Sequence, residues 1–176
     1  SRFMGKTHFK WLFKFAQAIK KYLSFPHIKS RRALVECMNI LQGINTDHKS
    51  HQELCSQLIN SFSLVPSYLK SYEFCKKVIE FAPMAIMHVP IGLQTNDLQK
   101  IAVSKNFNAL RCIPEELKTT DLCLIAYLKN NKALDYIPTH QQSEVVEKSL
   151  FFNSEKKNIK SKEDLDKFVQ KYTNIF

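Results

Sequence analysis

Glycine is scarce in this chain of 176 residues, which contains only three. Three glycines are too few for a collagen-like fibre or a glycine-rich phosphate-binding loop. The five cysteines (Cys37, Cys55, Cys75, Cys112 and Cys123) include no Cys-x-x-Cys pair. We therefore expect small core residues in a reducing, cytoplasmic compartment rather than a disulfide framework. No apolar run approaches the ~20 residues of a transmembrane helix, and lysines interrupt the apolar residues near the start, unlike in a secretory signal.

Acidic residues are absent from the first 35 positions, which hold nine of the 26 Lys and Arg residues. The other 141 residues carry 17 basic and 16 acidic groups, because 26 − 9 = 17. The net charge of +10 therefore describes the first segment and not the body of the chain. An anionic membrane surface or nucleic acid is a candidate partner for that segment alone. The first residue is Ser1, which is compatible with a fragment of a longer protein.

Internal repetition is the strongest positive signal. Four prolines, each preceded by valine or isoleucine, stand 24 residues apart: Pro66, Pro90, Pro114 and Pro138. Other positions keep the same period, among them a hydroxyl residue five positions after each proline (Ser71, Thr95, Thr119 and Ser143) and an alanine (Ala85, Ala109 and Ala133). A hydroxyl followed two residues later by Glu or Asp is typical of a helix N-terminus, so we expect a helix to begin there in each repeat.

Each repeat is predicted to hold one longer helix, ending near Asn106 and Asn130 in two of them, and a short helical segment closed by proline. Such small units bury their apolar faces only by stacking. The fold expected is all-α, a short α-solenoid of about three 24-residue helical repeats with flanking capping helices. A leucine-rich repeat has a compatible period, but its strand positions would fall on Ala102, Ser104 and Phe107, which do not fit.

The repeat residues also carry a family resemblance. The run Ile113-Pro114-Glu115-Glu116-Leu117-Lys118-Thr119, with Leu122-Cys123 and Ala133-Leu134-Asp135-Tyr136-Ile137-Pro138, resembles an uncharacterised bacterial helical-repeat family. Its units read V-P-E-E-L-K-T, L-C and A-L-x-Y-V-P, and it is a domain of unknown function. The similarity covers about residues 64 to 150. It implies a bacterial origin and an interaction scaffold of the kind attached to secreted effector-type proteins that act in a host cell.

Four segments follow from these patterns: residues 1–33, 34–63, 64–152 and 153–176. The first is a basic amphipathic helix with its tail, and the second holds capping helices or a degenerate repeat. Within the second, a helix over 34–43 should stop at Gly43, and Ser50 with Glu53 matches a capping box. The third segment holds the repeats. The fourth is expected to be a polar linker, 153–160, and a capping helix with Leu165, Phe168, Val169 and Tyr172 on one face.

On a helical wheel, the first segment places its aromatic and aliphatic residues on one side and lysines on the other. The apolar arc could pack on the first helices of the core, enter a bilayer interface or fill a partner's groove. Lipid binding would use Lys10, Trp11, Lys14, Phe15 and Lys21. Nucleic acid is not the expected partner, because the segment is poor in arginine.

Catalytic, cofactor and metal motifs are not recognisable in the sequence, and we predict no residues for these roles. Asp47, His48 and His51 are too few for a metal site. Cys112 is the only candidate nucleophile considered, since His88 and Tyr136 share its register, but a partly buried structural role is favoured. The expected function is protein–protein recognition through exposed repeat positions: Gln99, Lys100, Arg111, Lys129 and Asp135. Membrane-peripheral lipid binding is the alternative, and an enzyme remains a third class.

Overall fold

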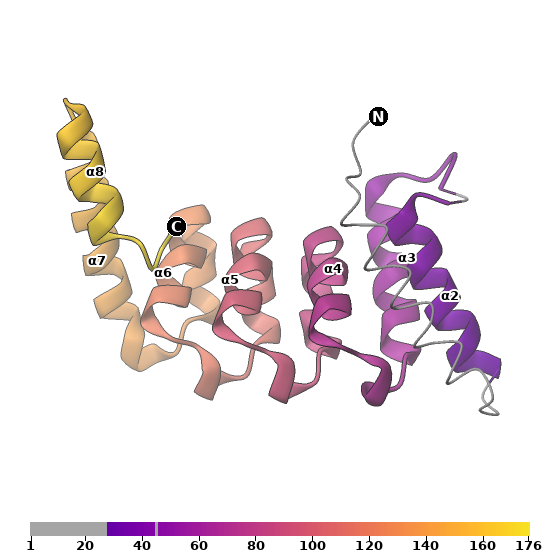
Figure 1. Cartoon of the computed structure of the whole chain (residues 1–176). Coiled ribbons are helices and arrows are strands. Elements are labelled where there is room, and N and C mark those ends of the chain that lie inside the picture. Colours follow the sequence, from indigo (N-terminus) through magenta and orange to yellow (C-terminus); the bar gives the residue numbers. More distant parts are fainter. Residues whose placement is uncertain (1–27, 45) are drawn as a thin grey trace.

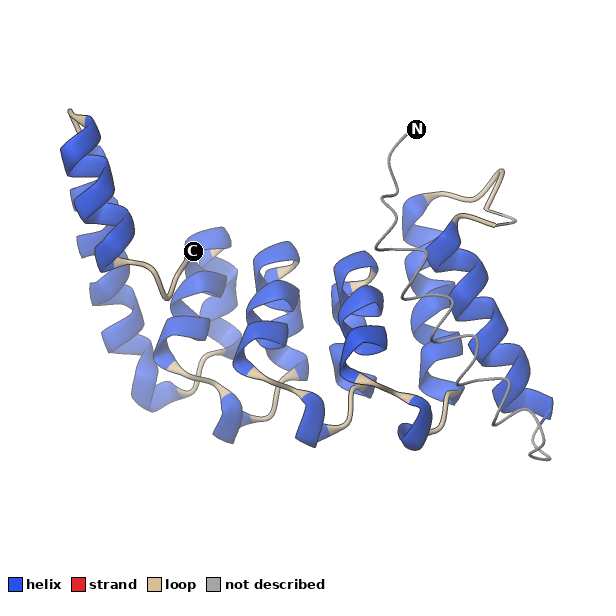
Figure 2. Cartoon of the chain, viewed as in Figure 1, coloured by secondary structure: helices blue, strands red, loops and turns tan. Residues whose placement is uncertain are grey.

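A computed structural model describes residues 28–44 and 46–176, and every regular element in these two stretches is a helix (Figures 1 and 2). The all-α expectation is therefore confirmed for the described residues. The elements are α2 (Ile28–Gln42), α3 (His51–Leu64), η1 (Ser67–Leu69), α4 (Tyr72–Phe81), η2 (Pro83–His88), η3 (Ile91–Leu93), α5 (Asn96–Lys105), η4 (Phe107–Cys112), η5 (Glu115–Leu117), α6 (Thr120–Lys129), η6 (Asn131–Tyr136), α7 (Thr139–Lys157) and α8 (Lys162–Lys171), where η marks a 3-10 helix. None of the described helices has the length and apolar composition needed to cross a membrane.

One order of elements occurs three times in succession: a three-residue 3-10 helix, a ten-residue α-helix and a six-residue 3-10 helix. The α-helix and the longer 3-10 helix correspond to the two predicted segments. The three-residue helix was not predicted. It forms because each proline carbonyl accepts a hydrogen bond from the leucine N–H three residues later, as from Leu93 to Pro90 at 2.8 Å.

The predicted N-caps begin all three α-helices. Ser71, Thr95 and Thr119 have extended backbones, and their hydroxyls accept hydrogen bonds from the N–H groups three residues later at 3.2 to 3.3 Å. Ser143 shares the register but lies inside α7, which begins earlier, at Thr139. Gln141 there replaces the half-buried leucine of the other units, so the short turn lacks its apolar anchor and the helix continues.

Asparagine separates the α-helix from the longer 3-10 helix in the second and third units, at the predicted positions, while Ala82 holds this place in the first. Asn106 and Asn130 are the C-caps of α5 and α6, and they are also the N-caps of the following 3-10 helices. Each side-chain oxygen accepts a hydrogen bond from the N–H two residues later, at 3.0 and 2.9 Å. One short polar side chain thus ends one helix and begins the next.

The repeated apolar positions form one continuous core. Fully buried residues include Phe74, Leu98 and Leu122 early in the α-helices, and Ala85, Ala109 and Ala133 in the longer 3-10 helices. The residue before each proline is buried as well, as Ile113 is. Three of the cysteines, Cys37, Cys75 and Cys123, are buried in this core, as predicted, and Cys55 and Cys112 are half-buried. All five thiols, which lie within the described residues, are free of disulfide bonds.

In the helix pair before the repeats, α2 ends and α3 begins at the predicted capping residues. Gly43 has a φ of +72°, and the N–H of Ile44 donates to the carbonyl of Asn39 at 2.8 Å, which makes a glycine C-cap for α2. Ser50 and Glu53 form the capping box of α3. However, α2 begins at Ile28 and not at residue 34, because lysine and arginine are good helix formers and the basic run continues the helix.

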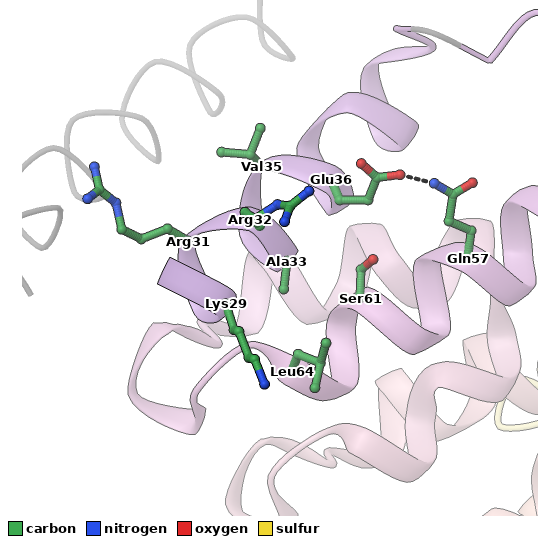
Figure 3. A pocket seen from close by; sticks show the side chains of 9 residues that line it. All are labelled: Lys29, Arg31, Arg32, Ala33, Val35, Glu36, Gln57, Ser61 and Leu64. Carbon is green, nitrogen blue, oxygen red and sulfur yellow. Dashed lines mark hydrogen bonds between the residues drawn. The ribbon is translucent and has the colours of Figure 1, made fainter. Parts of the chain in front are cut away.

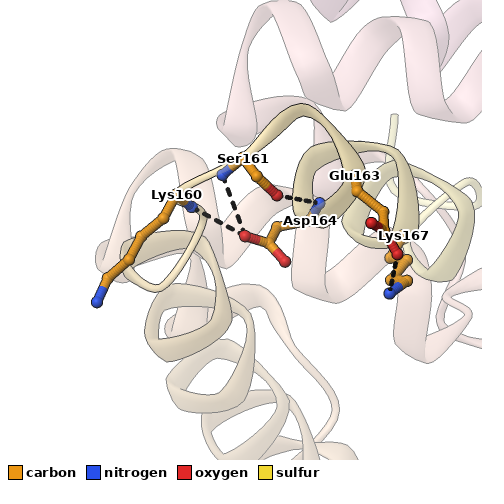
Figure 4. A network of polar contacts seen from close by, with 5 residues as sticks. All are labelled: Lys160, Ser161, Glu163, Asp164 and Lys167. Carbon is orange, nitrogen blue, oxygen red and sulfur yellow. Dashed lines mark hydrogen bonds and ion pairs between the residues drawn. The ribbon is translucent and has the colours of Figure 1, made fainter.

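The expected linker over 153–160 is largely wrong, since α7 extends to Lys157. Residues 153–160 include no proline or glycine, and their lysines and glutamate support a solvated helix. The turn is short, and Ser161 with Asp164 then forms a capping box for α8, in which Asp164 also accepts from the N–H of Lys160 at 3.2 Å (Figure 4). An i,i+4 ion pair at 2.7 Å joins Lys167 to Glu163.

The predicted inward face of α8 is only partly correct. Phe168 is buried and contacts Phe152 of α7, with ring centroids 5.0 Å apart. Leu165 and Val169, expected on the same buried face, are each 45% exposed. Phe168 is the one buried residue of α8, so only a narrow stripe of this helix is covered by neighbouring side chains.

The helices stand in a row (Figure 1). Helices α4, α5, α6 and α7 each contact the next along the chain, and so do η2, η4 and η6. The pair α2 and α3 lies at one end of the row, and α7 with α8 lies at the other. The short helices η1, η3 and η5 lie along one common edge, the lower one in Figure 2.

Candidate partner-binding edge

Two of the predicted partner-binding residues lie at equivalent exposed positions. Arg111 and Asp135 stand one residue before the C-terminal ends of η4 and η6, and Met87 occupies the same place in η2. All three side chains are exposed. Since η2, η4 and η6 are successive neighbours, these residues form a column across the row.

The other three predicted residues do not join this column. Gln99 is only 3% exposed, so its assignment to an exposed position is wrong. Its amide donates to the carbonyl of Gln94 at 3.1 Å, and its register is that of the buried Cys75 and Cys123. Lys100 is half-buried. Lys129 is exposed but ends α6, at the opposite end of the helices from the short turns.

The short 3-10 helices add exposed side chains next to this column. Tyr68 in η1 is 68% exposed, Met87 is 54% exposed and Ile91 in η3 is 66% exposed. Glu115 and Glu116 of η5 are also exposed. We call this set the turn edge, and it consists of Tyr68, Met87, Ile91, Arg111, Glu115, Glu116 and Asp135.

The turn edge differs from the core in how its residues vary between units. In the six-residue helices η2, η4 and η6, the exposed position next to the end holds methionine, arginine or aspartate. The buried position two residues before it is always alanine. The first turn position after proline likewise changes from serine to isoleucine to glutamate. The units therefore share one packing scheme and present different chemistry at this edge.

Four side chains that the sequence reasoning did not single out fix the backbone of this edge. They stand four residues after each proline and alternate between lysine and glutamine: Lys70, Gln94, Lys118 and Gln142. Each lysine donates 2.8 Å hydrogen bonds forward, Lys70 to the carbonyl of His88 and Lys118 to that of Tyr136. Each glutamine donates back into the preceding 3-10 helix and to the residue after it, as Gln94 does to Ile86 and Val89. The 24-residue spacing of these four residues was the feature of the sequence that could have revealed this column.

Lys70 is the most enclosed of these groups, with 7% of its surface exposed. Its ammonium lies 4.3 Å from the centroid of the Phe62 ring, a cation–π contact. Burial lowers the pKa of Lys70, and the nearby thiols of Cys75 and Cys37 act in the opposite direction. Gln94 is similarly buried, and its side-chain oxygen has no hydrogen-bond partner within the described residues.

The turn edge is predominantly acidic. Glu115, Glu116 and Asp135 oppose the single charge of Arg111, and the α-helices place Glu73, Asp97 and Asp121 in the first turns that face the same edge. These last three also stabilise the helix N-termini. The opposite edge carries the exposed Lys105, Lys129 and Lys132. The repeat body is therefore electrically polar although its net charge is small.

Cys112 was the candidate nucleophile that shares a register with His88 and Tyr136. It is half-buried at the end of η4, and within the described residues its thiol makes no hydrogen bond to His88 or Tyr136. The Tyr136 hydroxyl instead donates to the Asn108 side chain at 3.3 Å. Burial, and to a smaller extent the Lys70 charge, lowers the pKa of His88. The shared register thus brings these residues onto neighbouring elements without a hydrogen bond to the Cys112 thiol.

The last residues of the basic N-terminal segment line a cavity of about 760 Å³ between α2 and α3 (Figure 3). Lys29, Arg31 and Arg32 line it together with Val35 and Leu64. Figure 3 shows Arg31 directed away from Lys29, so the three charges do not converge on one point. The predicted lipid-binding residues, Lys10, Trp11, Lys14, Phe15 and Lys21, lie outside the described residues.

No group of three His, Cys, Asp or Glu side chains suited to a metal ion occurs among residues 28–44 and 46–176. Comparisons of the chain with models of known families, with curated proteins and with solved structures gave no match.

Proposed function

We propose that this chain is a short α-solenoid of three 24-residue units that acts as a protein–protein interaction scaffold and binds its partner along the turn edge. The main observation behind this proposal is that the buried positions repeat from unit to unit while the exposed positions vary. Resemblance to the bacterial helical-repeat family agrees with a scaffold in a bacterial effector-type protein. Hydrogen bonds from Lys70, Gln94, Lys118 and Gln142 keep the edge preorganised, which lowers the entropy lost on binding.

The chemistry of the edge favours a basic partner segment with apolar side chains. Tyr68, Met87 and Ile91 form the apolar half, and tyrosine and methionine are enriched in interface cores. Glu115, Glu116 and Asp135 form the acidic half. A partner with lysine or arginine beside one or two large apolar residues would complement both halves.

The test is selection from a displayed random-peptide library on the immobilised chain. Enriched peptides are expected to combine basic and large apolar residues. Their affinity, measured by isothermal titration calorimetry, should fall at least tenfold on Glu115→Lys/Glu116→Lys/Asp135→Lys and on Tyr68→Ala, because charge complementarity and a tyrosine anchor are both lost.

The matched control reverses the same number of charges on the opposite edge, as Lys105→Glu/Lys129→Glu/Lys132→Glu. This variant should keep the affinity of the original chain. Peptides that bind the turn-edge variants as tightly as the original chain, or that are lost only in the control, would place recognition elsewhere and refute the proposal.

A second candidate function rests on the amphipathic pattern of residues 9–23. Its apolar arc and opposed lysines support binding to anionic membrane surfaces, each lysine contributing about 1 kcal/mol near such a surface. Co-sedimentation with phosphatidylserine vesicles should fall when Lys10, Lys14 and Lys21 are replaced by Glu. Binding that survives this replacement would refute the lipid hypothesis and would not bear on the scaffold proposal.

A further inference from the structure

A second cleft, unrelated to the turn edge, lies beside the start of α3. It has a volume of about 720 Å³, and the residues that line it include His51, Cys55, Ile59, Phe81 and Met84. The set combines an imidazole, a thiol and a thioether. These are the side chains that bind soft metal ions.

The local sequence places the imidazole and the thiol together. The Ser50–Glu53 capping box fixes the first turn of α3, and His51 is the first residue of that helix. Cys55 follows four residues later, on the same face. The His51 Nε2 and Cys55 Sγ atoms lie 3.4 Å apart. The His51 ring also packs against the Phe81 ring, with centroids 5.0 Å apart and a 47° tilt, which orients the imidazole.

This separation matches two ligands of one metal ion. With metal–sulfur and metal–nitrogen bonds of about 2.3 and 2.0 Å and angles of about 100° to 120°, the two ligand atoms lie roughly 3.3 to 3.7 Å apart. The observed 3.4 Å therefore needs no movement of the helix. Coordination would also break the weak hydrogen bond that the thiol donates to the Phe81 carbonyl at 3.5 Å.

We propose that His51, Cys55 and Met84 form a binding site for a soft monovalent d10 cation of the Cu(I) class. The described residues hold no cluster of three His, Cys, Asp or Glu, so the usual zinc ligand set is missing. Cu(I) accepts thiolate, imidazole and thioether ligands. Its complex with one thiolate carries no net charge, which suits a cleft walled by Ile59 and Phe81.

Binding replaces the thiol proton. The Cys55 S–H bond breaks, the sulfur keeps the electron pair and coordinates the cation, and the proton passes to solvent. Burial raises the pKa of Cys55, so the free thiol is a poor nucleophile at neutral pH and the metal must displace a bound proton.

The test is anaerobic competition of the full chain with the chromophoric chelator bicinchoninate for Cu(I). One tightly bound equivalent is expected, with sulfur and nitrogen neighbours in X-ray absorption. Cys55→Ser should weaken binding at least 100-fold, and His51→Asn and Met84→Leu at least tenfold each. The matched control is Cys112→Ser, which removes the other half-buried thiol and should leave the affinity unchanged.

Three results would overturn the site: undiminished affinity in any one of the three ligand variants, loss of the tight equivalent in Cys112→Ser, or binding with no proton release. Far-ultraviolet circular dichroism of each variant monitors folding. Cys55→Ser and Met84→Leu nearly conserve volume, so neither substitution should unfold the chain.

Discussion

At the scale of single residues, the lysine and glutamine column joins the fold to its candidate surface. Lys70 and Lys118 make the same 2.8 Å hydrogen bond to a carbonyl 18 residues ahead, but Lys70 is more buried and also lies over Phe62. The two lysines therefore form a natural pair in which burial and the aromatic contact vary while the hydrogen bond is constant.

Lys70→Met should lower the free energy of unfolding by about 1–3 kcal/mol, because a carbonyl in a buried region loses its donor and the cation–π contact is lost. Lys118→Met should cost less. Urea denaturation followed by circular dichroism measures both, with the exposed Lys129→Met as control. Equal losses for Lys70→Met and Lys129→Met would show that the bond to His88 contributes nothing.

His88 gives the fold a pH dependence. Burial, aided by the Lys70 charge, holds its pKa below the ordinary value of 6.5, so on acidification the unfolded chain takes up the proton before the folded chain does. Stability from this group is therefore complete above pH 6.5 and decreases as the pH falls through 6.5 towards the lowered pKa. His88→Gln should flatten the fall in melting temperature between pH 7.5 and 5, and an unchanged slope would contradict this origin.

At the scale of elements, a hydroxyl residue caps a helix only where the residues before it are not themselves helical. Thr119 and Ser143 have the same place in the 24-residue period, and both are exposed hydroxyl residues. Thr119 caps α6, whereas Ser143 lies within α7 and caps nothing. The sequence period alone cannot separate the two.

Thr119→Ala should lower the free energy of unfolding by about 1 kcal/mol, because the N–H of Leu122 loses its acceptor. Ser143→Ala, the matched control, should change it by only a few tenths of a kcal/mol, in the stabilising direction, since alanine is the better helix former. Thermal and urea unfolding measure both. A comparable loss at Ser143 would mean that the period, and not the observed helix start, governs capping.

At the scale of the whole molecule, each unit is stabilised by its neighbours, so the two ends of the row should respond to mutation separately. Helix α8 contacts α7 through an aromatic cluster of Phe152, Phe168, Tyr172 and Phe176. In a linear array each unit contacts mainly its neighbours, so we expect the loss of a terminal contact to stay local.

Phe168→Ala removes a ring that is only 7% exposed, a change that typically costs about 3–5 kcal/mol in a core. We expect hydrogen exchange to accelerate throughout α8 and the last turns of α7, while α4 and α5 keep their protection. Val169→Ala, the adjacent exposed position, should leave exchange near its original rate. Equal acceleration in α4 would show that the row unfolds as one cooperative unit.

The sequence by itself determined the period, most of the helix caps, two asparagine breaks and most of the buried columns, because each depends on hydrogen bonds or apolar spacing within a few residues. Gly43, Ser50, Thr95 and Asn130 all act as their local chemistry predicts. These short-range rules are the same wherever the unit lies in the row.

Only the tertiary structure decided which side chains meet across units. It buried Gln99, assigned Lys70 to a carbonyl 18 residues away and left Leu165 45% exposed at the last helix. It also packed the Phe81 ring against His51 and put Met84 in the same cleft as Cys55. These outcomes depend on the space between neighbouring units, and a 24-residue period sets the order of the units without setting that space.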